Sequence, residues 1–311
     1  MAAQTSAVSL RTNFRRKMRK LAEDTAAAAL QSHRVRQYAF NALHLLTDSA
    51  SVTVNGIHYV FPTSDWIIGR SLYIDGRWDD EFMQATVNVL TERRPSPSFA
   101  EGIFVDVGAN IGTTTIQALA RYGARHAVAV EPSPECLPYL YSNLAANRLS
   151  GRCDIVEAAV SDVSGEVAFR AGKDNSGAGE VMWDGDPHDY AVRSQTLDDI
   201  IPSLGIGLDE LSLVWIDAEG QEYRILNGAK NIIAAGTPMV IEFWPQRLRE
   251  NGDYSRLIET LALSFGTIID IRAYVQGTRG SIVESSAEAI DAQAKALGPW
   301  PTDLLLLPNQ P

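Results

Sequence analysis

Two glycines and an acid have the spacing of a ligand-binding loop. Gly108 and Gly112 enclose a short run of small residues that follows the apolar segment 103–107. Gly108 permits a sharp turn and a close backbone approach to a ligand, and Gly112 lets the next helix pack hard against the strand. That helix would offer unpaired N–H groups to a carboxylate. Glu131 then follows a second apolar segment, 126–130, where an acid can accept both hydroxyls of a ribose.

The spacing of the glycines favours S-adenosylmethionine over a dinucleotide. A G-x-G-x-x-G fingerprint requires glycine at the positions that Asn110 and Thr113 occupy here. An asparagine side chain would obstruct the close approach of a pyrophosphate, whereas a nucleoside without phosphates needs no such space. The alternative is that the glycines serve only a tight turn and that Glu131 faces water.

The predicted cofactor site combines the loop, the acid and the end of a third strand. Residues 153–160 form that strand, and Ser161 follows at its carboxyl end, where side chains commonly meet an adenine edge. We therefore expect cofactor contacts from Asp106, Gly108, Ala109, Asn110, Gly112, Thr113, Glu131, Pro132, Ala159 and Ser161.

Two further acids lie where a methyl acceptor would bind. Asp217 lies near the end of the run 211–220, and Glu242 near the end of 238–245. Methyl transfer from a sulfonium is an in-line displacement, so the protein must align the acceptor and, for an alcohol, take its proton. Asp217 is the first candidate for that base or for a contact with the hydroxyl. Glu242 is the second, as a hydroxyl ligand or as support for Asp217.

A histidine offers another catalytic base. His188 lies in the Gly- and Asp-rich segment 172–190, together with Trp183 and Tyr190, whose rings could stack on a sugar. Segments of this kind near the carboxyl edge of a sheet often cover a substrate. The alternative is an ordinary loop with a surface histidine.

Other roles for the acids stay open at this point. Asp217 could hold the ammonium of the methionine or cap a helix that begins near Gln221, and Glu219 could face the site or pair with a nearby base. Asp217, Glu219 and Glu242 could also bind Mg²⁺, which prefers oxygen ligands. Acid clusters at strand ends more often bind ligands or backbone, so we predict no metal.

Alternating strands and helices must position these residues. Apolar runs predict strands at 103–107, 126–130, 153–160, 211–220, 238–245, 267–275 and 302–308. Helical patterns fall between them, at 113–122, 135–147, 197–204, 222–235, 253–264 and 285–296. This order predicts an α/β fold, a class I methyltransferase Rossmann-like sheet that is mostly parallel, with an antiparallel seventh strand beside the sixth. Its ligand would bind beyond the first and fourth strands, where the strand order reverses.

The chain resembles the FkbM family of S-adenosylmethionine-dependent methyltransferases over roughly residues 80–308. The resemblance lies in the segments FVDVGANIG, AVEPSPECLPYLYSNL, SQTLDDI, IDAEGQEYRILNGA and VIEFWP. It implies an O-methyltransferase that acts on hydroxyls of sugars, glycoconjugates or secondary metabolites. Trp215 departs from the lysine that is usual in the family, so no role of that lysine is carried over. The alternatives are a carboxylate or amine acceptor, or a non-catalytic protein that binds S-adenosylmethionine.

Composition limits the classes of partner. The net charge of −11 argues against a nucleic-acid partner, which would need a clustered basic face. Cys136 and Cys153 are predicted to be buried apolar side chains in a reducing cytoplasm rather than a disulfide or metal pair. No segment has the length of a membrane-spanning helix, and the first residues lack the apolar core of a signal peptide. We therefore expect a cytoplasmic enzyme; its oligomeric state is not indicated.

The N-terminal third has a different character. The segment 11–20 concentrates six positive charges, which is typical either of contact with an anionic membrane surface or acidic partner, or of a solvated leader. Asn55-Gly56 lies between alternating apolar runs in 51–63 and predicts a β-hairpin over the edge or mouth of the domain. We divide the chain into a basic leader (1–20), a helical and β-hairpin extension (21–95) and a methyltransferase domain (96–311).

Overall fold

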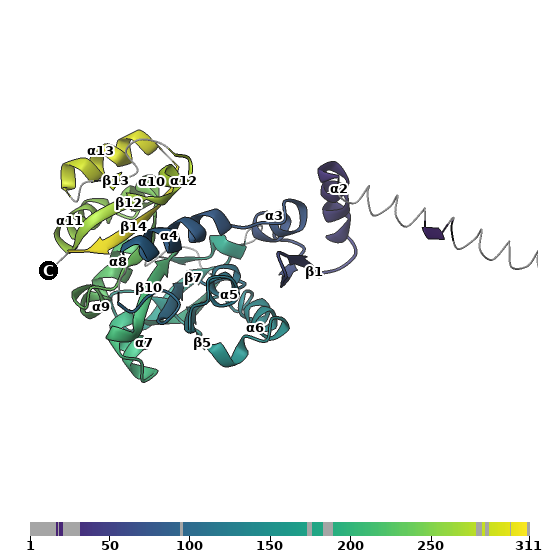
Figure 1. Ribbon diagram of the computed structural model, residues 1–311, viewed down its shortest axis with the longest axis horizontal. Coiled ribbons are helices and arrows are strands. Elements are labelled where there is room, and N and C mark those ends of the chain that lie inside the picture. Colours follow the sequence, from purple (N-terminus) through teal and green to yellow (C-terminus); the bar gives the residue numbers. More distant parts are fainter. Residues whose placement is uncertain are drawn as a thin grey trace, which may run out of the picture.

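The computed structural model is built around an eight-stranded sheet with helices on both faces (Figure 1). It describes residues 17, 19–20, 32–93, 96–172, 176–182, 189–277, 282–283, 286–298 and 300–309. The strands of the central sheet are β3 (Ile103–Val107), β4 (His126–Val130), β5 (Cys153–Val156), β10 (Leu211–Ile216), β11 (Met239–Phe243), β12 (Phe265–Asp270), β13 (Ile282–Val283) and β14 (Thr302–Pro308). Their order across the sheet is β13-β12-β14-β11-β10-β3-β4-β5.

The directions of the strands confirm the predicted class I methyltransferase sheet. Strands β3, β4, β5, β10 and β11 run parallel, and β14 is antiparallel to both of its neighbours, β11 and β12. The chain order reverses between β3 and β10, so the carboxyl ends of these two strands flank the crevice in which open α/β sheets bind ligands. Strand β13 adds a further antiparallel strand at the edge, which the sequence did not indicate.

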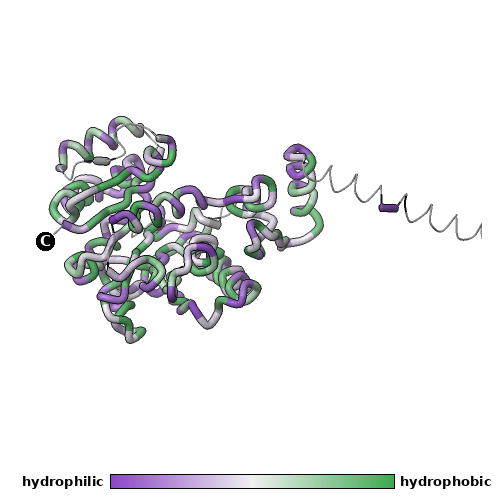
Figure 2. Tube along the Cα trace, in the orientation of Figure 1, coloured by the Kyte–Doolittle hydropathy of each residue, from purple (hydrophilic) through white to green (hydrophobic). Residues whose placement is uncertain are grey.

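Side chains that alternate along each strand sort the core onto two faces. Phe104 and Leu305 pack on one face with α4 (Asp80–Arg93), α5 (Thr113–Ala120) and α6 (Leu137–Ala146). Val105 and Ile216 pack on the other with α7 (Leu197–Ser203), α8 (Glu222–Asn227), α9 (Lys230–Ala234), α11 (Tyr254–Ser264) and α13 (Ala287–Leu297). Figure 2 shows apolar strands at the centre and polar stretches along the outer helices.

Three predicted boundaries are wrong. Residues 153–160 are not one strand, because β5 ends at Val156 and β6 (Ala159–Val160) joins a separate four-stranded sheet. The predicted helix 222–235 breaks into α8 and α9 around Gly228, where a Cβ would come 2.3 Å from the carbonyl oxygen of Ser161. The predicted strand 267–275 is β12 followed by a helix, since Asp270 caps that helix by accepting a hydrogen bond from the N–H of Ala273 at 2.9 Å.

A separate sheet and several short helices accompany the central sheet. The separate sheet has the order β6-β9-β7-β8, and of its strands only β8 (Glu180–Met182) lies wholly in the segment 172–190 that was predicted to be a loop. Its other strands are β6, β7 (Gly165–Arg170) and β9 (Tyr190–Gln195). The remaining helices are α10 (Pro245–Glu250), α12 (Ile271–Val275) and the 3₁₀ turns η1 (Ser150–Arg152), η2 (Ser176–Ala178) and η3 (Leu208–Glu210).

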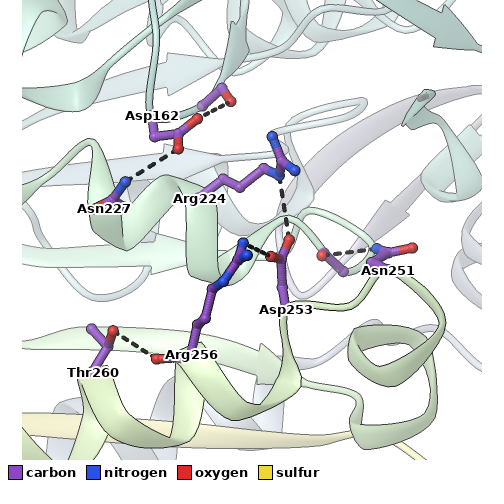
Figure 3. Close-up of polar contacts among 9 residues, drawn as sticks. Asp162, Arg224, Asn227, Asn251, Asp253, Arg256 and Thr260 are labelled. Carbon is purple, nitrogen blue, oxygen red and sulfur yellow. Dashed lines mark hydrogen bonds and ion pairs between the residues drawn. The ribbon is translucent and has the colours of Figure 1, made fainter. Parts of the chain in front are cut away.

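A polar network holds the turn that follows β10 (Figure 3). The carboxylate of Asp253 is 1% exposed and accepts hydrogen bonds from Arg224 Nε at 3.3 Å and from Arg256 Nη1 at 3.2 Å. Asn251 Nδ2 donates to the carbonyl oxygen of Gly220 at 3.1 Å. Helices α8 and α11 are therefore tied to each other and to the turn, which carries acids of the candidate site.

The N-terminal extension consists of α2 (His33–Leu43), the hairpin β1 (Ser49–Val54) and β2 (Ile57–Pro62), and α3 (Ile68–Ile74). The predicted Asn-Gly turn is confirmed, with φ of 51° at Asn55 and 83° at Gly56. The hairpin packs on α6, and its apolar side chains are continuous with the core on that face of the sheet. The mouth of the crevice is instead covered by α3 and the residues after it.

Asn143 fastens the hairpin to the domain. Its buried side chain donates from Nδ2 to the carbonyl oxygens of Val60 at 2.9 Å and Ile111 at 2.8 Å, and its Oδ1 accepts from the N–H of Val60. Asn147 binds His58 in the same way, through its Oδ1 at 2.9 Å and its Nδ2 at 2.7 Å. Two side-chain amides therefore satisfy the outer edge of β2 as a neighbouring strand would.

Two further predictions concern membranes and cysteines. Within the described residues, no helix is long and apolar enough to cross a bilayer. Cys136 and Cys153 are buried, as predicted, and no disulfide joins these two residues. Most of the segment 11–20 lies outside the described residues, so its contact with a membrane or an acidic partner stays a prediction.

We expect Asn143→Ala to lower the free energy of unfolding by about 2–4 kcal/mol, because three backbone groups lose their buried partners. Asn88→Ala on the exposed face of α4 is the matched control and should change it by less than about 0.5 kcal/mol. Urea denaturation followed by circular dichroism measures both. Equal stability of the two variants would contradict the assigned role of Asn143.

Candidate active site

A cavity of about 360 Å³ opens at the carboxyl edge of the central sheet. Its walls come from the loops after β3, β4 and β10, from β11 and β14, and from the separate sheet. The N-terminal extension contributes Ile67, Ile68 and Trp78 to the walls of the cavity. The cavity lies at the strand-order reversal, as the sequence analysis expected.

Gly108 brings the two halves of the cavity together. Its φ is +84°, and a Cβ there would lie only 1.9 Å from the carbonyl oxygen of Asp217. The N–H groups of Gly108 and Ala109 both donate to the carbonyl oxygen of Val130, at 3.0 and 3.1 Å. The loop after β3 is therefore pressed against the end of β10 on one side and β4 on the other.

Glu131 is held rigidly at the wall of the cavity. Its Oε2 accepts from the N–H of Asn110 at 2.7 Å and its Oε1 from the N–H of Ser133 at 2.8 Å. Burial raises the pKa of Glu131 to about 7, although these two hydrogen bonds act in the opposite direction. Each carboxylate oxygen has two lone pairs, so both can accept one more hydrogen bond from a ligand.

Asn110 is an unsatisfied polar residue in the same wall. It is 7% exposed and has a φ of 51°. Neither its Oδ1 nor its Nδ2 has a hydrogen-bond partner in the described part of the protein. A buried amide without partners is costly, so its presence in a cavity wall indicates a group that binds a ligand.

Five other residues that were predicted to bind the cofactor also line the cavity: Asp106, Ala109, Thr113, Pro132 and Ala159. Asp106 accepts a hydrogen bond from Thr115 Oγ1, and burial raises the pKa of Asp106 to about 6.

Two predicted residues lie away from the cavity surface. Gly112 acts through packing, because a Cβ there would come 2.6 Å from Leu140 Cδ1. Ser161 lies behind the wall and donates from its hydroxyl to Asp162 Oδ1 at 3.2 Å. Neither is among the described residues that line the cavity.

Three adjacent strands present a line of acids on one face, which we call the carboxylate row: Asp217, Glu242 and Asp303. Glu242 of β11 lies directly opposite Asp303 of β14. Asp217 follows Ile216, whose partner Ile241 precedes Glu242, so it continues the row on β10. All three line the cavity. Like charges directly opposite each other destabilise a sheet, which indicates that the row serves a ligand.

The row is electrostatically strained. Removal from bulk water and the neighbouring carboxylates raise the pKa of Asp217 and of Glu242 well above their usual values. Asp217 keeps access to solvent through the cavity. The Oε2 atom of Glu242 is buried and has no hydrogen-bond partner among the described residues.

Further charged groups surround the row. Burial raises the pKa of Glu219 and of Asp79 to about 7. Arg272 Nη2 lies 3.3 Å from Asp303 Oδ2, while burial raises the pKa of Asp303 against the effect of this arginine. Among the described residues that line the cavity, seven are acidic and Arg272 alone is basic.

Several of these residues were not predicted from the sequence. Asp303 could have been found, because the amino end of an antiparallel strand lies at the same edge as the carboxyl ends of its parallel neighbours. Asp79 and Trp78 precede α4 and Arg272 lies in a short helix, so no strand pattern marks them. Trp215, where the resembled family has lysine, also lines the cavity.

Part of segment 172–190 reaches the cavity, through Gly177, Gly179 and Val181. His188 and Trp183 lie outside the described residues, so their proposed roles stay predictions. Tyr190 donates from its hydroxyl to Glu135 Oε2 at 2.5 Å and stacks on Phe169 at 5.6 Å between ring centroids. It lines a separate hollow beside α6 rather than the cavity.

The structure also bears on the magnesium alternative. Across the described ranges of the chain, no group of three or more His, Cys, Asp or Glu side chains has an arrangement that could hold a metal ion.

We expect Gly108→Ala to destabilise the protein by about 2–5 kcal/mol, through a positive φ and a clash with the Asp217 carbonyl. Gly123→Ala is the matched control, because Gly123 has a φ of +78° but no atom within 4 Å of the place that an added methyl group would take. That control isolates the cost of the positive φ, about 1–2 kcal/mol. Thermal unfolding that shifts equally in both variants would refute the close contact.

The raised pKa values predict how stability depends on pH. Asp79, Glu131, Glu219 and Glu222 bind protons more tightly in the folded state, with pKa values of about 7. Their contribution to stability is therefore lost as pH rises from their unfolded values near 4 through 7. We expect the melting temperature to fall between about pH 5 and pH 7 and to change less above that, and Glu242→Gln to raise it at about pH 8. Scanning calorimetry tests both; a rise with pH would contradict this assignment.

Comparisons with known proteins show the family of this chain. Residues 106–271 match the model of the methyltransferase FkbM domain. The 2-O-methyltransferase NoeI of Sinorhizobium fredii is 24% identical over 191 residues, which are 56% of this chain and 76% of that protein. Two solved structures are similar at low TM-scores. Cofactor-bound Rv0187 from MTB has 14% identity, a TM-score of 0.41, and coverage of 76% of this chain and 82% of that one. TYW2 of P. horikoshii, in complex with MeSAdo, has 11% identity, a TM-score of 0.41, and coverage of 84% and 71%. With its family model spanning more than half of its length, the chain belongs to the FkbM methyltransferase family.

Proposed function

We propose that the protein transfers a methyl group from S-adenosylmethionine to a hydroxyl of a neutral sugar, glycoconjugate or secondary metabolite. One observation carries the proposal: the loop of Gly108, with Glu131 beside it, and the carboxylate row line one continuous cavity. A nucleoside cofactor bound to the Gly108 loop and an alcohol bound to the carboxylate row would meet end to end. The name of the relative NoeI, a 2-O-methyltransferase, supports a hydroxyl acceptor.

The residues present fit S-adenosylmethionine. Glu131 has free lone pairs for the two ribose hydroxyls, and Asn110 has a free amide for a polar group of the cofactor. The N-terminus of α5, with Thr113 in the wall, offers N–H groups to the methionine carboxylate. When bound, the cofactor supplies an electrophilic methyl on a sulfonium, and the protein's task is to align an acceptor with it.

Asp217 is the group that we assign to the acceptor's proton. It stands at the boundary between the Gly108 loop and the rest of the carboxylate row. A raised pKa makes a carboxylate a stronger base, which suits removal of a proton from an alcohol near neutral pH. Glu242 lies on the next strand, where it can accept a hydrogen bond from the same or a neighbouring hydroxyl.

The charge of the cavity limits the acceptor. With seven acids and a single arginine among the described lining residues, an acceptor with a phosphate or carboxylate near its reacting hydroxyl would be repelled. The aromatic side chains Trp78 and Trp215 offer apolar surfaces against which a sugar ring can pack. A neutral polyhydroxylated acceptor fits these walls better than a nucleic acid does.

Two variants should fail in different ways. Asp217→Asn should lower turnover at least about 100-fold, as expected on loss of a general base, while affinity for S-adenosylhomocysteine stays within about threefold. Glu131→Gln should weaken S-adenosylhomocysteine binding at least about tenfold, because a charged acceptor of hydrogen bonds is lost. Calorimetric titration measures the binding. Mass spectrometry of neutral sugars and matching uronic acids, incubated with labelled S-adenosylmethionine, measures the transfer.

The outcomes separate the assignments. Loss of S-adenosylhomocysteine binding in Asp217→Asn would move Asp217 to the cofactor site. Methylation of the uronic acids in preference to the neutral sugars would overturn the proposed acceptor class. No binding of S-adenosylmethionine or its product by the unaltered protein would overturn the proposed function itself.

A further inference from the structure

The carboxylate row contains more acidic groups than a general base requires. One carboxylate suffices to take a proton from an alcohol, yet Glu242 and Asp303 lie opposite each other and next to Asp217 in register. Arg272 forms an ion pair with Asp303, and the Oε2 of Glu242 has no hydrogen-bond partner within the described residues. The sheet holds these carboxyls side by side, and their mutual repulsion helps to raise the pKa of Asp217 and of Glu242, so a cation beside them would favour the ionised forms.

The row acts on the space where the methyl group is transferred. Neighbouring strands lie about 4.8 Å apart, so Asp217, Glu242 and Asp303 lie about one, two and three spacings (roughly 5, 10 and 14 Å) from β3, the strand that leads into the Gly108 loop. Trp215, Trp78 and Val107 also line this space, while Asp217 stays open to solvent through the cavity. Charges near a protein surface still interact appreciably over such distances, so the row contributes to the potential at the end of the cofactor loop.

The cofactor changes charge at this point of the reaction. The acceptor oxygen forms a bond to the methyl carbon with a lone pair, and the carbon–sulfur bond breaks with its electron pair left on sulfur. The hydroxyl proton passes to the carboxylate of Asp217 and from there to water. A positively charged sulfonium therefore becomes a neutral thioether.

We propose that the carboxylate row selects the positively charged cofactor over its neutral product, and so promotes release of the product after each transfer. The inference rests on the proposed function. It assigns Glu242 and Asp303 to recognition of charge rather than to the chemical step. A neutral thioether gains nothing from the row, whereas a cation at the same position relieves the repulsion among the three carboxylates.

Binding of two unreactive ligands tests the proposal. Sinefungin carries a protonated amine in place of the methylated sulfur, and S-adenosylhomocysteine carries no charge there. We expect the unaltered protein to bind sinefungin at least tenfold more tightly at pH 8. Glu242→Gln, which keeps the shape of the side chain, should reduce this ratio at least threefold, mainly through the affinity for sinefungin.

Controls keep the test independent of folding. Glu259→Gln makes the same substitution on the exposed surface of α11 and should leave the ratio unchanged. Asp303→Asn is the second variant of the row and should lower the ratio as Glu242→Gln does. Thermal unfolding of each variant shows that it is folded before titration.

The pH dependence gives a second readout. Charged groups face the row from the segment before α4 (Asp79), from the turn after β10 (Glu219), from α8 (Glu222) and from α12 (Arg272). The raised pKa values of Asp79, Glu219 and Glu222, about 7, mean that these carboxyls gain charge as pH rises through 7. The preference for sinefungin should therefore increase from pH 6 to pH 8.

Distinct results would overturn the two proposals. Equal affinities for sinefungin and S-adenosylhomocysteine, or a ratio that neither row variant lowers, would overturn selection by charge while leaving the proposed function intact. A preference that decreases from pH 6 to pH 8 would also overturn it. Failure to bind either ligand would instead refute the proposed function.

Discussion

Among the described glycines, Gly108 has the least room for a side chain, because the backbone of Asp217 lies directly beside it. The carbonyl oxygen of Asp217 occupies the space that any side chain at Gly108 would fill. Because of this contact, the loop after β3 and the end of β10 form one surface instead of two separate loops. The proposed cofactor site and the carboxylate row therefore have a fixed relation to each other. The polar network around Asp253 holds the turn after β10 from the opposite side.

The same region concentrates groups that weaken the fold. Glu242 opposes Asp303, Asn110 has no partner within the described residues, and several acids hold protons near neutral pH. Such costs are typical of functional sites and must be offset elsewhere in the structure. Here two continuous apolar cores cover the sheet, and Asn143 fixes the hairpin to the same body. The rigid surroundings explain how the sheet can keep like charges side by side.

Much of the fold could be predicted because its signals are local. Each buried strand is a short apolar run, and the glycines of the loop after β3 have a spacing that excludes a dinucleotide. The parts that were wrong depend on contacts distant in sequence. Strand β6 leaves the central sheet because it pairs with β9, more than thirty residues later. The predicted helix 222–235 breaks at Gly228, where the backbone of Ser161 approaches from another part of the chain.

The candidate site follows the same division. Asp217 and Glu242 were predicted, because each lies at the carboxyl end of an apolar run, and the carboxyl ends of parallel strands share one edge of the sheet. Asp303 begins a strand, and only the antiparallel direction of β14 brings it to that edge. Asp79 reaches the cavity from outside the sheet, so no periodicity in its own segment could indicate it. The sequence therefore identified single acids, whereas the row is a property of three paired strands.

Trp215 places an uncharged side chain beside the carboxylate row. Trp215 lies two residues before Asp217, which follows β10, so both side chains are on the same face of the sheet. Both line the cavity. The resembled family usually has lysine at this position. An ammonium there would lie beside the row and neutralise part of its charge, as Arg272 does for Asp303. Tryptophan carries no charge that could neutralise the row. The departure from the family pattern therefore leaves this cavity more acidic beside Asp217.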